Sequence, residues 1–176
     1  MTSVRCRAAT IADAPSLADV FVSAWRVGFR GLLSQSALDG LDANASRARW
    51  EADLAPERAG PPYVLAAEFG EVVCGLAVYG PSRDADASVD SGEVFALHVL
   101  PTHWGRGAGA ALLRTAAASL GSLGSTEARL WVIEGNARAR RFYEHNGWRC
   151  DGNQRDRTIG GGLIREVRYR IGIDPR

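Results

Sequence analysis

Lysine is absent from this sequence: all 21 basic side chains are arginine, and 20 acidic residues bring the formal net charge to +1. A chain this balanced creates no strong positive field, which excludes nucleic acids and anionic membranes as partners held by charge alone. Any charged ligand must therefore be bound by local groups. We interpret the arginine bias, with the abundant alanine and glycine, as the coding bias of a GC-rich bacterial genome, without mechanistic meaning.

Cysteine is scarce, and long apolar runs are missing. Cys6, Cys74 and Cys150 are an odd number, lie far apart and lack the neighbouring Cys or His that a disulfide framework or a zinc site requires. No stretch reaches the roughly 18 apolar residues of a membrane span, and residues 1–14 lack the apolar segment of a signal peptide. We therefore expect a cytoplasmic protein without a metal site.

The length of 176 residues predicts one domain over residues 1–176, because no internal repeat and no long linker divides the chain. Capping residues and apolar spacing predict the first elements. These are a short strand at Val4–Ala8, a helix that begins after Thr10–Asp13, and a second helix over Ser34–Leu54. The N-terminal third is therefore predicted to be mainly helical.

The rest of the chain alternates strands with helices. Tyr63–Phe69 and Val72–Tyr79 predict an antiparallel hairpin around Gly70-Glu71. The elements predicted after it are a strand at Glu93–Leu100, a helix at Ala108–Leu120, a strand at Arg129–Ile133, a helix at Ala137–Asn146, and strands at Trp148–Arg157 and Ile164–Ile171. A strand, a helix and a strand in this order form a β-α-β crossover, so we predict a mixed α/β fold with one central parallel pair.

Glycines at positions 105, 107 and 109 separate the strand and the helix of that crossover. Backbone N–H groups at such a helix start point the same way, and glycines let a diphosphate come within hydrogen-bonding distance of the main chain. The segment therefore predicts a phosphate site. The alternative is a tight turn that binds nothing.

The same segment also fits a dinucleotide fingerprint. Gly105-x-Gly107-x-x-Ala110 has the GxGxxA form, with Glu127 and Glu134 downstream. However, Pro101–Trp104 separates the strand from the first glycine, and only one parallel crossover is predicted. A second nucleotide-binding half is thus missing, which argues against a dinucleotide-binding protein.

The residues around the glycine loop resemble two motifs of the GCN5-related N-acetyltransferase (GNAT) family. Glu93–Pro101 and the following Trp104–Gly109 are similar to motif A, whose core reads R/Q-x-x-G-x-G/A, with Trp104 in place of Arg or Gln. Similar to motif B are Leu130–Asn136, Ala139, Phe142-Tyr143-Glu144 and Gly147-Trp148. The resemblance implies the GNAT fold, a mixed and mostly antiparallel sheet with one central parallel β-α-β pair and helices on both faces.

The resemblance also implies an N-acetyltransferase that uses acetyl-CoA as cosubstrate. Main-chain groups at Leu97, His98 and Val99 would pair with the pantetheine arm as a strand pairs with a sheet edge. Asn136 would help to hold the same arm, and its alternative role is that of a helix N-cap. The other cofactor-binding residues implied are Trp104, Gly105, Arg106, Gly107, Ala108, Gly109 and Ala110.

Two side chains match the proton-transfer residues of the family. Glu93 opens the central strand at the position of a catalytic glutamate, which would accept a proton from the ammonium of the acceptor. The alternative is an exposed carboxylate at a strand end. Tyr143 matches the tyrosine that protonates the coenzyme A thiolate, and its alternative is a core aromatic. His98 is the second choice of base, and its alternative is a hydrogen-bonded core histidine.

The acceptor site is implied only in outline. In the family it lies between the first helices and the final hairpin, which places Trp25, Phe29 and Arg30 on one side and Asn153–Arg165 on the other. The acceptor could be a peptide or protein amine, a polyamine, an amino acid analogue or an aminoglycoside-like antibiotic, and the sequence selects none of them. A domain that binds acyl-CoA without turnover is the alternative function. Because many members are dimers, a homodimer through the C-terminal strands is a further expectation.

Overall fold

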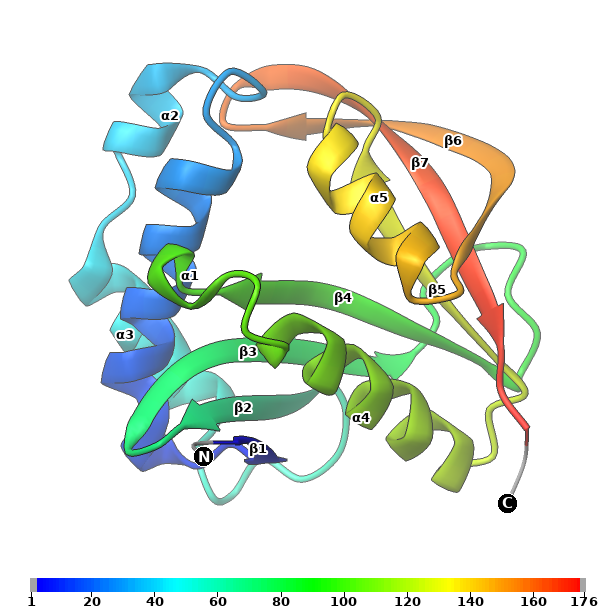
Figure 1. The fold of residues 1–176 in the computed structure, drawn as a ribbon, viewed down its shortest axis with the longest axis horizontal. Coiled ribbons are helices and arrows are strands. Elements are labelled where there is room, and N and C mark those ends of the chain that lie inside the picture. The colour runs from blue at the N-terminus through cyan, green and yellow to red at the C-terminus, as the bar shows by residue number, and fades with distance from the viewer. Residues whose placement is uncertain (1–2, 175–176) are drawn as a thin grey trace.

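The computed structural model describes residues 3–174, so residues 1–2 and 175–176 of the predicted domain lie outside it. One sheet contains all the described strands, in the order β1-β2-β3-β4-β5-β7-β6 (Figure 1). The strands are β1 (Val4–Ala8), β2 (Tyr63–Phe69), β3 (Val72–Pro81), β4 (Ser91–Val99), β5 (Glu127–Ile133), β6 (Arg149–Ile159) and β7 (Gly162–Gly172). The α-helices are α1 (Ala14–Gly28), α2 (Gln35–Asp39), α3 (Ala43–Asp53), α4 (Ala108–Ser122) and α5 (Ala137–His145), and two 3-10 helices are η1 (Ile11–Asp13) and η2 (Pro101–His103).

Each neighbouring pair of described strands is antiparallel except β4 and β5. Helix α4 connects these two parallel strands, as a β-α-β crossover requires. The predicted fold class, a mixed and mostly antiparallel sheet with one central parallel pair, is therefore confirmed.

Helices cover both faces of the sheet, and four consecutive residues of β2 show why. Val64 and Ala66 pack with α1 and α3 on one face, whereas Leu65 and Ala67 pack with α4 on the other. Side chains along a strand alternate between the faces, so one apolar run contributes to two separate cores. Within residues 3–174, no helix is both long enough and apolar enough to cross a membrane.

The prediction of a single helix over residues 34–54 is wrong, because the chain forms α2 and α3 there with a break between them. Gly40 follows the last residue of α2, and its N–H donates to the Ser36 carbonyl at 3.0 Å. Asp42 then begins α3, since its side chain accepts a hydrogen bond of 2.8 Å from the Asn44 N–H. Such a cap satisfies an N–H group that the start of a helix leaves without a partner.

Strands β4 and β5 begin side by side and then diverge, which opens the sheet near its centre (Figure 1). They pair only at Ser91/Glu127, Gly92/Ala128 and Glu93/Arg129. The register between β3 and β4 also shifts by one residue at a β-bulge, where Phe95 is the extra residue. A β-bulge and a short parallel pair therefore occur together at the centre of the sheet, and Glu93 lies where the two strands part.

Candidate active site

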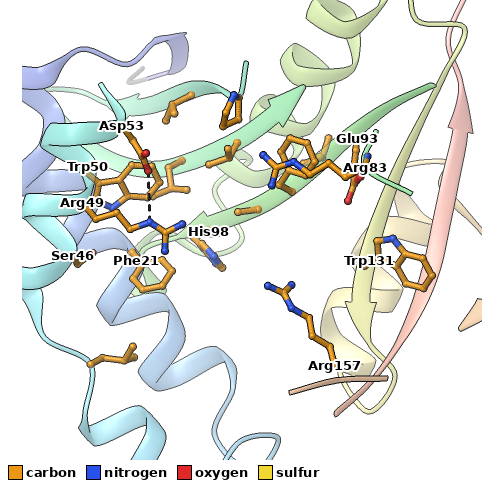
Figure 2. A pocket seen from close by; sticks show the side chains of 18 of the residues that line it. Phe21, Ser46, Arg49, Trp50, Asp53, Arg83, Glu93, His98, Trp131 and Arg157 are labelled. Carbon is orange, nitrogen blue, oxygen red and sulfur yellow. Dashed lines mark hydrogen bonds and ion pairs between the residues drawn. The ribbon is translucent and has the colours of Figure 1, made fainter. Parts of the chain in front are cut away.

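A cavity of about 830 Å³ lies on the side of the sheet that α1 and α3 cover. Figure 2 shows side chains from these helices, from β4 and β5, and from the C-terminal hairpin around it. Its wall is aromatic in part, with Phe21, Phe95 and Trp131. Glu93 and His98 line it, and so do Arg155, Asp156 and Arg157 from the segment Asn153–Arg165 that was expected beside the acceptor.

Glu93 lines this cavity and is buried, with 5% of the residue exposed. The Arg83 N–H donates to Glu93 Oε2 at 2.9 Å, and the Ser82 hydroxyl donates to the same oxygen at 3.2 Å. Burial raises the pKa of Glu93 above its ordinary value; the Arg83 N–H partly opposes this, and the negative charge of Asp84 adds to it. A carboxyl group with a raised pKa is a better proton acceptor than an ordinary surface glutamate.

The His98 side chain lines the same cavity, and the aromatic side chains of α1 and the residue after it fix its position. The indole N–H of Trp25 donates to His98 Nε2 at 3.1 Å, and the rings of Phe21 and Phe29 pack around the imidazole. Burial lowers the pKa of His98 to about 4, so the ring is neutral at physiological pH. Because Nε2 already accepts a hydrogen bond, His98 is the weaker of the two candidate bases.

The predicted acceptor residues on the helical side lie outside the cavity wall. Trp25 and Phe29 contact each other and His98, and Arg30 makes an isolated bridge with Leu33. In the described part of the chain, the α1 residue that lines the cavity is Phe21 instead. Trp25 therefore reaches the cavity only through His98.

The glycine loop leads into α4, and its glycines differ in their surroundings. Gly105 and Gly107 have φ angles of +74° and +86°, which L side chains rarely adopt, and a Cβ added to either would meet no atom within 4 Å. Gly107 is the N-cap of α4, so this open space lies at the start of the helix, where the first N–H groups have no acceptor within the helix. Gly109 is different, because an added Cβ would lie 3.2 Å from Phe142 of α5. Its role is close packing of α4 against α5.

Trp104, which replaces the Arg or Gln of the motif, binds the protein itself. Its indole N–H donates to the Val99 carbonyl at 2.8 Å, at the end of β4. The guanidinium carbon of Arg138, on α5, lies 3.4 Å from the centre of the Trp104 ring. Trp104 thus connects the end of β4 to α5. In the same loop, the guanidinium carbon of Arg106 lies 5.4 Å from the centre of the Phe69 ring.

Asn136 precedes the first residue of α5, and Tyr143 lies within this helix. The Asn136 side-chain oxygen accepts from the Ala139 N–H at 3.1 Å, so the residue is an N-cap. The Tyr143 ring packs between Trp148 and Tyr169, on the face of the sheet that α4 covers. Burial raises the pKa of Tyr143 to about 12, which keeps the phenol protonated.

Glu93 and Tyr143 therefore lie on opposite faces of the sheet. The glycine loop and α5 are on the Tyr143 side, and the cavity is on the Glu93 side. Between them is the opening where β4 and β5 part beyond Glu93. An acyl donor bound on one face and an acceptor bound on the other would meet at this opening.

Several residues at or near the cavity have no signal in the sequence motifs. Arg83, which lines the cavity, and its neighbour Ser82 belong to a loop that the sequence marks only as polar, yet both donate hydrogen bonds to Glu93. The register of the β3–β4 pair could have indicated them, because Gly80 lies opposite Glu93. Arg157 also lines the cavity; it lies within Asn153–Arg165, the segment expected beside the acceptor, but no motif singles it out.

Comparisons with known proteins show the family to which the chain belongs. The model of the acetyltransferase (GNAT) family matches residues 29–148. A probable N-acetyltransferase of Mycobacterium tuberculosis (strain ATCC 25618 / H37Rv) is 30% identical over 173 residues, which cover 97% of this chain and 94% of that relative. The chain therefore belongs to the GNAT family and is an acetyl-CoA-dependent acyltransferase, as predicted.

Two solved structures share the fold. The PaiA N-acetyltransferase from Thermoplasma acidophilum, in complex with coenzyme A, has a TM-score of 0.72 and 20% identity over 93% of this chain and 98% of that chain. The yncA structure from Salmonella typhimurium, with its cofactor acetyl-CoA, has a TM-score of 0.68 and 21% identity over 99% of this chain and 96% of that chain. At these identities the likeness shows the fold alone.

Proposed function

We propose that this chain forms a single N-acetyltransferase domain that transfers the acetyl group of acetyl-CoA to a primary amine bound in the cavity. The observation that carries the proposal is the opening between β4 and β5, which has a buried carboxylate on one face and an open glycine loop on the other. This arrangement lets two substrates approach one point from opposite faces.

The cosubstrate fits the glycine-loop face. Open space at Gly105 and Gly107 and the first N–H groups of α4 suit a diphosphate. The PaiA and yncA structures, which share the fold, were solved with coenzyme A and with acetyl-CoA. We assign Leu97–Val99 to the pantetheine arm, because β4 is unpaired on the β5 side there. Trp104 would contribute by fixing the Val99 carbonyl rather than by binding phosphate.

Glu93 and Tyr143 are the proposed proton-transfer residues. Glu93 accepts one proton from the acceptor ammonium, and the neutral amine then forms the new C–N bond to the acetyl carbon of the thioester. Tyr143 donates its proton to the sulfur as the C–S bond breaks, and the second proton of the nitrogen restores the phenol. The raised pKa of Glu93 makes its carboxylate a stronger base, and the raised pKa of Tyr143 keeps the phenol protonated, so that it still carries the proton to donate.

Two measurements test the proposal. Acetyl-CoA should raise the Tm, because a ligand that binds only the folded state stabilises it, and NAD should not. Thiol release from acetyl-CoA should depend on an added amine, with a panel that includes amino acids, polyamines, aminoglycosides and peptides. Binding of acetyl-CoA without amine-dependent thiol release would favour a non-catalytic acyl-CoA-binding domain. Stabilisation by NAD alone would favour a dinucleotide-binding protein.

A homodimer through the C-terminal strands stays a prediction. Strand β6 lies at the edge of the sheet, where its outer hydrogen-bonding groups are free to pair with a second copy. Light scattering measures this directly, and a mass near 18.9 kDa would contradict the prediction.

A further inference from the structure

Most charged side chains in the wall of the cavity are already neutralised by a neighbour. The ion pairs are Arg49–Asp53 at 3.6 Å, Arg155–Glu166 at 2.7 Å and Asp156–Arg165 at 2.9 Å. The ion-paired groups offer little net charge to a ligand. Asp42 keeps its negative charge, but its carboxylate caps α3 by accepting a hydrogen bond from the Asn44 N–H.

Two guanidinium groups in the cavity wall have no acidic partner within residues 3–174. Arg83 and Arg157 line the cavity, and neither forms an ion pair within residues 3–174. The guanidinium carbon of Arg83 lies 4.1 Å from the centre of the Phe95 ring, which holds this side chain over β4. Figure 2 shows Arg157 reaching into the cavity from the side opposite Arg83 and His98.

Glu93 also lines the cavity and forms no ion pair within residues 3–174. Its carboxylate accepts hydrogen bonds from the Arg83 N–H and the Ser82 hydroxyl, and it is the proposed base. Apart from the helix-capping Asp42, the charged groups of the cavity wall without an oppositely charged partner in this part of the chain are therefore Glu93, Arg83 and Arg157. A polyamine or an aminoglycoside would bring further positive charge toward the two arginines, which costs free energy in a partly enclosed site.

We infer that the acceptor is a primary amine that also carries an anionic group, such as the carboxylate of an amino acid. Its ammonium group binds beside Glu93, and its anionic group binds the guanidinium groups of Arg83 and Arg157. Arginine suits this role because its N–H groups form charge-assisted, bidentate hydrogen bonds to a carboxylate. This inference rests on the proposed acetyl transfer, since it places the acceptor in the same cavity.

The test compares amino acids with their carboxamides, which have nearly the same shape but no negative charge. For the unmodified protein, kcat/KM should be roughly tenfold or more higher for the acid, the usual scale of one charged hydrogen bond. The amine of a carboxamide has the lower pKa and is more often neutral, so amine reactivity alone would favour the carboxamide. A preference for the acid therefore reports recognition of its charge.

Two variants test whether Arg157 and Arg83 recognise the negative charge of the acceptor. Arg157→Gln and Arg83→Gln should each reduce the preference for the acid by roughly tenfold, mainly through KM. Arg83→Gln keeps the main-chain N–H that binds Glu93, so it separates the side chain from the support of the base. The matched control is Arg47→Gln, because Arg47 is exposed on α3, pairs with Glu51 at 2.8 Å and lies outside the cavity wall. It should leave the preference unchanged.

A second experiment measures binding of the reaction products and needs no catalytic turnover. With coenzyme A present, N-acetylated amino acids should raise the Tm more than N-acetylated amino acid amides, and Arg157→Gln should remove the difference. Equal thiol release from acids and carboxamides, or equal Tm shifts by the two products, would overturn the inference and leave acetyl transfer intact. Absence of thiol release with every amine would instead contradict the proposed function.

Discussion

The two faces of the central opening are built in different ways. On the α4 face, the glycine loop and the start of α4 are one continuous segment, and open main-chain N–H groups are its main feature. On the other face, the cavity takes residues from α1, α3, the β3–β4 loop, β4, β5 and the C-terminal hairpin. Its main feature is the division of its charged side chains into those that form ion pairs and those that do not.

This difference determines which kind of substitution each face tolerates. A main-chain cradle tolerates a changed side chain, and Trp104 illustrates this by binding Val99 where the motif has Arg or Gln. The cavity has no such shared backbone feature, so single side chains decide which acceptor fits. We therefore expect backbone changes to damage the first face and side-chain changes to damage the second.

The largest expected effect is that of Gly107→Glu on the glycine-loop face. A side chain there is strained at a φ of +86°, points into the open cradle and adds negative charge where a diphosphate would bind. Acetyl-CoA should no longer raise the Tm, and thiol release should fall below detection. Gly124→Glu is the matched control, since Gly124 has a φ of +93° and equally open space beyond the far end of α4. A normal acetyl-CoA shift in Gly107→Glu would contradict the cradle.

Glu93→Gln should have the next largest effect, and only on the cavity side. We expect kcat/KM for the amine to fall roughly 100-fold near neutral pH, the usual scale for loss of a general base. Part of the loss should return at high pH, where an amine of ordinary pKa, about 10, deprotonates by itself. In the unmodified protein, kcat/KM should rise as the pH passes through the raised pKa of Glu93.

Stability and cofactor binding provide the control for Glu93→Gln. Because burial raises the pKa of Glu93, its charged form destabilises the fold at neutral pH, so the substitution should not lower the Tm. The Tm shift with acetyl-CoA should also be unchanged. Full activity of this variant across the pH range would remove Glu93 from the mechanism.

Tyr143→Phe should have a smaller effect, roughly tenfold on kcat, because coenzyme A thiolate is itself a fairly good leaving group. High pH should not rescue this variant, since the missing group is a proton donor whose pKa is already about 12. The contrast in pH profile with Glu93→Gln, measured by thiol release, separates the two roles. Rescue of both variants at high pH would indicate that Tyr143 does not donate the proton.

The smallest effect is expected for His98→Gln, less than about fivefold on kcat/KM. The imidazole has a pKa near 4 and its Nε2 accepts the Trp25 N–H, and a glutamine side chain can accept the same hydrogen bond. The pH profile should keep its shape. A loss as large as that of Glu93→Gln, with the same rescue at high pH, would make His98 the base.

Much of the fold could be predicted from local patterns. The strands around Val64 and Val94, the helix after Gly107 and the parallel crossover follow from apolar periodicity, caps and glycines, and the structure has them within a few residues. The break between α2 and α3 was missed because residues 34–54 contain one glycine and no proline, and a lone glycine is tolerated inside helices. Only the cap at Asp42 shows that the chain starts a new helix there.

The sequence by itself determined the family, the glycine loop and the candidates Glu93 and Tyr143, because these depend on short segments whose backbone or spacing is fixed locally. Only the tertiary structure decided that His98 is held by Trp25, that Ser82 and Arg83 bond to Glu93, and that Arg157 enters the same cavity. The physical reason is that pairing of charges depends on distance in space. Twenty-one arginines and twenty acids look balanced in the sequence, and only folding decides which guanidinium groups line the cavity without an ion pair within residues 3–174.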